Sequence, residues 1–363
     1  MIARTCIALA AATLLSGTAY AAPLTANQML QQFNVVVSGN LTSTSHVDGR
    51  TYVGQNANGG DYVQHVNDTP ASAYAGLTVG GALSGNVHVN GLGLVTGGDA
   101  NGINVNNGSA YVGGSASGSS FNGDAWIVGA ANGGNFNGGI HAASYTNINV
   151  NPGRVLAAPT GAMTSTLAAS TSTNFGAVMT GLSSQLSAMH ATDGTKVTYS
   201  NNDSNVLLSG KAVNGVLVFD LTKDDSKIFS NKVTDISFDL GGASTVIFNT
   251  DDSNLSLSAN FNQAQALGSK LIWNFAGHDN SVTVGRTFGG QVLVADGTFS
   301  NVGGANVEGG VFAKTLNQFG EIHLQSFTGT VPSAPVPEPE TYAMLLAGLG
   351  VMGTVLRRRK KQG

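Results

Sequence analysis

The chain has 363 residues and a formal net charge of −4, with 50 glycines and only 10% charged residues. Its 42% apolar content argues against plain disorder, and abundant glycine without a triplet repeat excludes collagen. The acidic balance argues against a nucleic-acid partner. A β-rich fold with many tight turns remains, because glycine adopts the positive φ angles that such turns need.

The first 21 residues have the layout of a secretory signal peptide. Arg4 precedes a short apolar run at residues 7–15, and Ala19 and Ala21 form a small-x-small cleavage pattern. We therefore expect export and cleavage by signal peptidase after Ala21. The single cysteine, Cys6, lies inside this segment, so the mature chain is expected to contain no disulfide and no cysteine nucleophile.

A short helix is expected at residues 26–33, where it would cap the first coil of the fold described below. After this helix the sequence repeats at a nearly constant interval. Four glycines that begin each repeat are separated by 17, 16 and 16 positions: Gly80, Gly97, Gly113 and Gly129. Each repeat closes on an Asn-Gly pair. A unit of this length is too short for a helical pair or a propeller blade, and it fits one coil of a β-solenoid. In such a coil each short strand pairs with its copy in the next coil, and glycine and asparagine occupy the corners.

The apolar residues around the start of each repeat are expected to alternate inward and to fill a narrow interior. They are Leu77, Val79, Leu94, Val112, Trp126 and Val128. Trp126 could stack on a sugar, but burial is the preferred interpretation. The alternative for the whole segment is a Gly/Asn-rich disordered linker, which the fixed offsets and interleaved apolar residues disfavour.

A second helix is expected after residue 170, followed by more strands. Apolar residues there share one helical face, with a possible N-cap among residues 171–173: Phe175, Val178, Met179, Leu182, Leu186 and Met189. Short β-type runs return after Lys196, and Gly-Gly pairs at residues 289–290 and 309–310 indicate that the solenoid resumes. The predicted fold is mainly β: a parallel β-helix or solenoid with Gly/Asn-rich coils of about 16 residues and one flanking amphipathic α-helix.

The C-terminal end has three parts in a fixed order. The first is Pro337, Glu338 and Pro339. The second is an apolar run at residues 342–356, expected to be a membrane helix, which includes Tyr342, Leu345, Leu346, Leu349, Val351, Val355 and Leu356. The third is a basic stop that the positive-inside rule keeps cytoplasmic, made of Arg357, Arg358, Arg359, Lys360 and Lys361.

This order resembles the PEP-CTERM sorting signal. The resemblance implies recognition and cleavage by an exosortase, a transient anchor in the inner membrane, and a Gram-negative host that makes exopolysaccharide. The mature protein would then reside at the cell surface, in the outer membrane or in the extracellular matrix. A plain anchor that is never processed is the alternative.

The body between the two ends resembles the choice-of-anchor A domain over residues 24–329. The resemblance rests on the order of several short motifs, among them residues 32–40, 244–249, 270–275 and 309–313. Asp296 and Gly297 depart from the family pattern, which puts one corner in doubt. The family combines interchangeable surface anchors with no established catalytic activity. The expected organisation is therefore a signal peptide at residues 1–21, a body at 22–330 and a sorting tail at 331–363.

Few residues of the body predict chemistry. The seven histidines are far apart in sequence and none follows a His-Glu-x-x-His or Cys/His metal spacing. Asp224–Asp225 and Asp251–Asp252 are candidates for acid/base catalysis, but both pairs sit in polar turns that favour solvated loops. No cofactor is expected. A structural calcium ion is the weak exception, with Asp251 and Asp252 or the segment 202–205 as candidate ligands.

Three functions from different classes follow. The first is a non-enzymatic surface or matrix protein, structural or adhesive in a biofilm or envelope, whose partners beyond the processing enzymes are exopolysaccharide or other surface glycans. The second is a carbohydrate- or ice-binding module, although ice binding predicts ranks of threonine and the repeats offer more asparagine and serine. The third is a polysaccharide lyase or hydrolase, which requires Asp224, Asp251 and Lys227 on one face.

Overall fold

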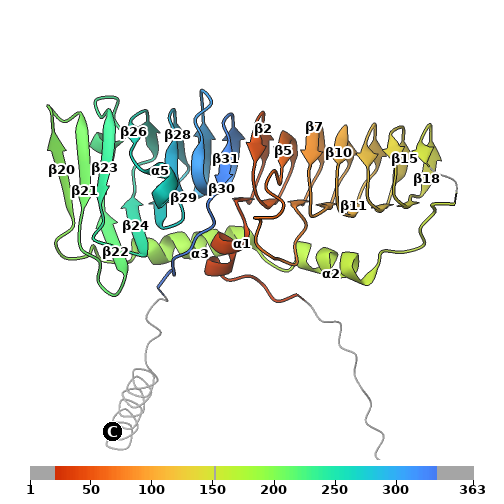
Figure 1. Cartoon of the computed structure of the whole chain (residues 1–363), viewed down its shortest axis with the longest axis horizontal. Helices are drawn as coiled ribbons and strands as arrows, with labels where there is room; N and C mark the ends of the chain where they lie inside the picture. Colours follow the sequence, from red (N-terminus) through yellow and green to blue (C-terminus); the bar gives the residue numbers. More distant parts are fainter. Residues whose placement is uncertain (1–20, 151–152, 333–363) are drawn as a thin grey trace, which may run out of the picture.

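The computed structural model describes residues 21–150 and 153–332, which form a long rod of short parallel strands (Figure 1). Most strands belong to one 27-stranded sheet that winds around a narrow core. The predicted parallel β-solenoid is therefore confirmed. The predicted sorting signal at residues 337–339, the apolar run and basic residues up to 361, and Ala19 lie outside the described residues.

The N-terminal arm of the rod is built from coils of three short strands each. The first side holds β1 (Val35–Val37), β4 (Thr51–Val53), β6 (Leu77–Val79), β8 (Leu94–Thr96), β11 (Ala110–Val112), β14 (Ala125–Ile127) and β17 (Ile140–His141). The second side holds β2 (Leu41–Ser43), the start of β5 (Ala57–Tyr62) and of β7 (Leu83–Val89), β9 (Ala100–Asn101), β12 (Ala116–Ser117), β15 (Ala130–Asn132) and β18 (Ser144–Thr146). The third side holds β3 (His46–Val47), the ends of β5 and β7, β10 (Ile103–Val105), β13 (Ser120–Phe121), β16 (Asn135–Phe136) and β19 (Asn149–Val150).

The C-terminal arm continues the same sides with longer strands. The first side holds β22 (Val216–Asp220), β24 (Thr245–Thr250), β27 (Leu271–Phe275) and parts of β29 (Phe288–Asn301) and β30 (Val307–Gln318). The second side holds β25 (Asn254–Leu257) and β28 (Asn280–Val284), which lead into the ends of β29 and β30. A separate four-stranded sheet contains β20 (Lys196–Ser200), β21 (Asn205–Ser209), β23 (Asp235–Asp239) and β26 (Asn260–Phe261), and β31 (Ile322–Leu324) closes the third side.

The two arms meet in the middle of the rod, where β30 and β31 lie beside β2 (Figure 1). β1 pairs in parallel with β4 on one side and with β30 on the other, so that Val35 faces both Thr51 and Val311. β2 pairs with β30, and β3 pairs with β31. We call this junction of β1–β3 with β30 and β31 the seam. The chain thus starts at the seam, builds one arm, returns along the rod and builds the other arm back to the seam.

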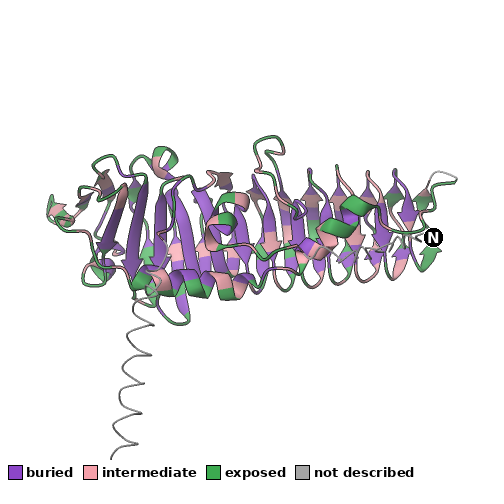
Figure 2. Cartoon of the chain, turned by 90° about the horizontal axis from the view of Figure 1, so that it is seen from below, coloured by how far each residue is buried: buried purple, intermediate pink, exposed green. Residues whose placement is uncertain are grey.

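Helices cover one side of the rod (Figure 2). α3 (Phe175–Ser187) is the predicted amphipathic helix, and it buries Phe175, Met179, Leu182 and Leu186 against outward apolar residues of the first side. α2 (Gly161–Ser170) adds a second flanking helix that the sequence did not predict. The N-cap of α3 is Asn174, whose side chain accepts a hydrogen bond from the Ala177 amide, so the expected cap at residues 171–173 is wrong.

The remaining helices are short. α4 (Asp225–Ile228) and α5 (Ala264–Leu267) are single turns, and α1 (Ala26–Gln32) is the predicted N-terminal helix, stabilised by a capping box between Thr25 and Gln28. The prediction that α1 caps the first coil is wrong. The edge of β1 is already paired with β30, and α1 packs instead with α3 on the helix-covered side.

The core runs through both arms but changes composition at the seam. The N-terminal arm is filled mainly by Val, Leu, Ile and Ala, whereas the C-terminal arm contains stacked aromatic rings such as Phe248 and Trp273, 4.1 Å apart between centroids. The aromatic residues in the core of the N-terminal arm are fewer, and they include the stacked pair Phe121 and Phe136, 5.4 Å apart between centroids. Burial of this continuous core is the dominant stabilising term of the fold.

One predicted part of the core is wrong by a single position. Val112 pairs with Ile127, so this coil has 15 residues and Val128 is 55% exposed. Ala125 and Ile127 fill the interior, and Trp126 between them points out of the coil, although it is only 3% exposed. Side chains alternate between the inside and the outside along a strand. A coil one residue shorter than predicted therefore places Ile127 inside, where a 16-residue coil would place Val128.

Candidate functional site

The outward residues of the second side form a continuous row of small polar side chains. Strand pairing places them in register through both arms and across the seam: Ser256, Thr283, Ser300, Asn317, Thr42, Asn58, Ser84, Asn101, Ser117, Asn132 and Thr146. Each of them is exposed or half-buried. We call this row the polar ladder. Its steps are about 4.8 Å apart, the spacing of paired strands.

Hydrogen bonds within the polar ladder hold some of its side chains in place. The Asn58 amide donates to Ser84 Oγ at 2.9 Å, and the Asn317 amide donates to Ser300 Oγ at 3.3 Å. A separate row at a corner, predicted from the Asn-Gly repeats, includes a bond of 2.8 Å from Asn106 to Asn90. These contacts limit the rotation of the amides, so the rod presents donors and acceptors at fixed intervals.

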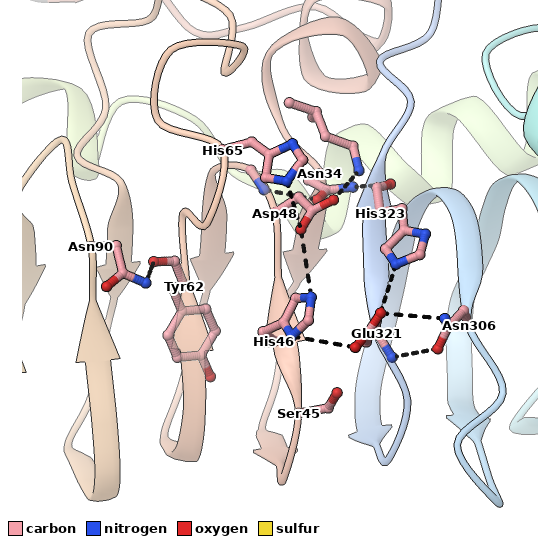
Figure 3. Close-up of polar contacts among 12 residues, drawn as sticks. Asn34, Ser45, His46, Asp48, Tyr62, His65, Asn90, Asn306, Glu321 and His323 are labelled. Carbon is pink, nitrogen blue, oxygen red and sulfur yellow. Dashed lines mark hydrogen bonds and ion pairs between the residues drawn. The ribbon is translucent and has the colours of Figure 1, made fainter.

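The third side carries a different group of residues at the seam (Figure 3). His46 lies in register with Asp61, and Asp61 with His88, to which it is hydrogen-bonded. On the other side of His46, its Nδ1 is 3.7 Å from Glu321 Oε1, and its Nε2 is 3.7 Å from Asp48 Oδ1. Imidazoles and carboxylates therefore alternate across the junction of the two arms.

His323 completes this group from β31. Its Nε2 is 2.8 Å from Glu321 Oε2, and its Nδ1 is 2.7 Å from Glu308 Oε1. A hollow of about 470 Å³ opens here, and its lining includes His46, Asp48, His65, Glu308, Glu321 and His323. We call these six residues the seam cluster.

The charges of the seam cluster perturb two of its members. The hydrogen bond from His323 lowers the pKa of Glu321 most, and the nearby imidazole of His46 lowers it further. Burial alone would lower the pKa of His323, but hydrogen bonds to Glu321 and Glu308 and the charges of Glu308 and Asp48 outweigh it and raise that pKa. Both shifts favour the charged forms of the pair.

The sequence did not predict the seam cluster. It brings together three of the seven histidines, and residues 46 and 323 are far apart along the chain. Only the parallel pairing of β3 with β31 makes them neighbours. The one signal in the sequence was that His323 stands two residues after Glu321, and His46 two residues before Asp48, as expected for side chains on the same face of a strand.

The carboxylates considered for catalysis make different contacts. Asp225, Asp251 and Asp252 have carboxylate oxygens within 4.8 Å of one another, although Asp225 already accepts from the backbone amides of residues 226, 251 and 252. Asp224 instead accepts the hydrogen bond of the Tyr199 hydroxyl at 3.0 Å.

Lys227, the basic residue required by the lyase hypothesis, is engaged elsewhere. Its Nζ is 3.3 Å from Asp203 and 3.6 Å from the centroid of the Tyr199 ring. The same Asp203 is 3.2 Å from Lys232 Nζ, so this residue of the second candidate calcium segment pairs with two lysines. The weak calcium candidates Asp251 and Asp252 stay a prediction.

Comparison with known proteins gives two matches. The family described as "Putative Ice-binding-like adhesive domain" matches residues 26–324, and the PEP-CTERM protein-sorting motif matches residues 335–360. No curated protein and no solved structure matches the chain. The sorting motif implies exosortase processing and a membrane-sorted protein of the cell surface. The more specific resemblance to the choice-of-anchor A domain stays a prediction.

The helices of the rod are short. In the part of the chain that the structure describes, none combines the length and the apolar character needed to cross a bilayer. The apolar run predicted to be a membrane helix, at residues 342–356, falls outside that part and within the match to the sorting motif.

Proposed function

Because the chain belongs to the ice-binding-like adhesive domain family and ends in a PEP-CTERM motif, we propose that it is a non-enzymatic adhesive protein of the bacterial surface. After export and exosortase processing, the rod holds exopolysaccharide or other glycan chains at the surface of a Gram-negative cell or in its matrix. The polar ladder is the contact surface, and its uninterrupted register across the seam is the observation that supports this function most directly.

The chemistry of the ladder suits a sugar polymer. Hydroxyl and amide groups can donate and accept hydrogen bonds with sugar hydroxyls, and each such contact is weak. A chain lying along the rod meets many of them at once, so the contacts act with a high effective concentration. A rigid solenoid loses little backbone entropy on binding, and hydrogen bonds to Ser84 and Ser300 already hold the Asn58 and Asn317 side chains in place.

The existing contacts of the candidate acids and of Lys227 support a function without catalysis. A glycosidase needs two carboxylates that face one another across the substrate, at about 5 to 10 Å. Here Asp224 is tied to Tyr199, while Asp251 lies beside Asp225, and Lys227 contacts Asp203. The polar ladder itself contains no ionisable side chain.

Removal of side chains from the polar ladder tests the glycan proposal. We expect the full chain with Asn58→Ala, Asn101→Ala and Asn132→Ala to bind the exopolysaccharide of its host at least tenfold more weakly, because the contacts act together. The matched control removes three asparagines from the third side: Asn104→Ala, Asn135→Ala and Asn149→Ala. Sedimentation of the protein with the purified polymer measures the difference. Equal retention of both variants and the unaltered protein would rule out the ladder as the contact surface.

Binding to ice is the second candidate, and the regular spacing of the ladder favours it. Only three of the eleven ladder positions, Thr42, Thr146 and Thr283, carry threonine. The other positions carry asparagine or serine, whereas the expectation for an ice-binding surface is ranks of threonine, so the ladder composition disfavours ice. Inhibition of ice recrystallisation by the unaltered protein, lost in the Asn58/Asn101/Asn132 variant, would establish ice as the ligand instead of glycan.

The sorting proposal has a separate test. We expect Pro337→Ala with Pro339→Ala to leave the protein in the inner membrane with the electrophoretic mobility of the unprocessed form. Deletion of the exosortase of the host should have the same effect. Fractionation followed by immunoblotting measures both, and a variant that still reaches the surface with the normal mobility would contradict processing at this triplet.

A further inference from the structure

We propose that His46, Glu321 and His323 bind one divalent transition-metal cation of the zinc class, which links the first and the last coil of the chain at the seam. The site is independent of the polar ladder, because it lies on the third side of the rod. Imidazole and carboxylate are ligands that such cations accept, and the three residues come from β3, β31 and the residue before β31.

The positions of the donor atoms suit a metal ion. One ligand atom from each of the three side chains lies within 4.8 Å of the other two. The known pairs are His323 Nε2 to Glu321 Oε2 at 2.8 Å and His46 Nδ1 to Glu321 Oε1 at 3.7 Å. In a tetrahedral zinc site with bonds of about 2.1 Å, ligand atoms are separated by about 3.4 Å. Small rotations of half-exposed side chains cover the difference.

The second nitrogen of each histidine is placed as metal-binding histidines require. His323 turns Nε2 toward Glu321 and Nδ1 toward Glu308, 2.7 Å away. His46 turns Nδ1 toward Glu321 and Nε2 toward Asp48, 3.7 Å away. A carboxylate behind a ligating imidazole fixes its tautomer and increases its basicity. His323 has such a hydrogen-bonded carboxylate in Glu308, and Asp48 stands 3.7 Å behind His46, close enough to pair with it after a small side-chain rotation.

Glu308 provides an independent observation. The residue is only 9% exposed, it lines the same hollow, and its Oε2 has no hydrogen-bond partner among the described residues. A buried carboxylate without full pairing is costly, unless positive charge lies nearby. Glu308, Asp48 and Glu321 line the hollow together with three histidines. A dication bound there would offset the excess negative charge of these carboxylates.

Two other groups of potential ligands are less suitable. His278, Asp279 and Asp296 lie close together, but their side chains are 83%, 73% and 43% exposed, and Lys314 already pairs with both carboxylates. In the group of Asp225, Asp251 and Asp252, the buried member is occupied by backbone amides. Of these three groups, all within residues 21–150 and 153–332, the seam cluster is the one that combines imidazoles, a buried unpaired carboxylate oxygen and a hollow.

The test uses the full chain, stripped of metal with a chelator and titrated with zinc chloride in a calorimeter. We expect one equivalent of zinc to bind and to raise the melting temperature. His46→Gln with His323→Gln should weaken binding at least a hundredfold and remove the thermal shift. Glu308→Gln, which alters only the residue behind His323, should weaken it about ten- to a hundredfold. Cobalt(II) in place of zinc should give the intense visible absorption of a tetrahedral site.

Control variants make each outcome decisive. His190→Gln removes an exposed histidine outside the seam cluster, and His278→Gln tests the competing group, so both should bind zinc as the unaltered protein does. If the double histidine variant does not fold by circular dichroism, Glu321→Gln replaces it, with the same expected loss. The proposal is overturned if zinc binds equally well to the seam variants, if it binds to none of the proteins, or if only His278→Gln abolishes binding. Failure of this test leaves glycan binding by the polar ladder untouched, because the two sites share no residue.

Discussion

The glycines at the corners of the N-terminal arm belong to two series with different physical requirements. One series has positive φ angles, as at Gly85 (88°) and Gly102 (70°), which any other residue would adopt with strain. The second series has ordinary φ angles, but the neighbouring backbone leaves no space for a Cβ atom. A Cβ atom at Gly97 would collide with the carbonyl oxygen of Gly80 in the preceding coil, and one at Gly113 with that of Gly97.

A substitution at Gly97 tests the second requirement. We expect Gly97→Ala to lower the free energy of unfolding by about 1 to 3 kcal/mol, because the backbone of the neighbouring coil cannot move aside. Gly181→Ala is the matched control. Gly181 lies on the exposed face of α3 with nothing within 4 Å of the added atom, so alanine there should stabilise the protein by about 0.5 to 1 kcal/mol. Urea unfolding measures both, and a destabilisation of the same size at Gly181 would refute the steric explanation.

At the scale of the element, the coil is the unit of the N-terminal arm, and its length varies more than the sequence repeat indicates. Ala110 lies in register with Ala125, and Ser109 occupies the place that Asp124 takes in the next coil. Residues 110–124 therefore make up one complete coil of 15 residues. Each coil is stabilised by the coils on either side, so removal of a whole coil lets its two neighbours stack on one another.

Deletion of residues 110–124 should therefore leave a folded, shorter rod. We expect its melting transition to remain cooperative, because Leu94–Thr96 can then pair with Ala125–Ile127 in the same inward and outward pattern. The control deletes residues 110–123, one position fewer. That change moves the following strand by one residue and turns its core side chains outward. Circular dichroism and calorimetry distinguish the two, and equal stability of both deletions would show that register is not enforced.

At the scale of the whole molecule, the seam makes the two arms parts of one structure. The edge strands at the start and the end of the body cover each other, which removes two exposed strand edges that would otherwise invite association with other chains. The apolar face under α1 and α3 also crosses the seam, since it contains both Val36 from β1 and Phe312 from β30. Hydrogen bonds and buried apolar area therefore join the arms in addition to the connecting chain.

A cut in the connection between the arms tests this arrangement. We expect a protease site inserted between Ala157 and Ala158, both exposed, to be cleaved without separation of the two fragments. They should elute as one particle from a size-exclusion column and separate only in denaturant. Uncleaved protein with the same insertion is the control. Separate elution of the fragments under native conditions would show that the seam does not hold the arms together.

Predictions from sequence were most accurate for features that depend on near neighbours in the chain. The helical face of residues 175–186 and the repeated corner glycines depend on local spacing, and they predicted α3 and the coils. Predictions were wrong where a contact with another part of the chain decided the outcome. The edge covered by β30 displaced α1 from the end of the rod, and a 15-residue coil exchanged the positions of Ile127 and Val128.

The sequence by itself determined that this protein winds into a parallel solenoid with a helix on its flank, because periodic glycines and alternating apolar residues express local backbone geometry. The sorting motif is likewise a local pattern. Only the tertiary structure decided that residues 46 and 323 meet at a seam and that the polar ladder runs unbroken through both arms. The reason is physical. Pairing between β1–β3 and β30–β31 joins segments about 275 residues apart, and packing of the shared core sets the register of that pairing, which no spacing along the chain records.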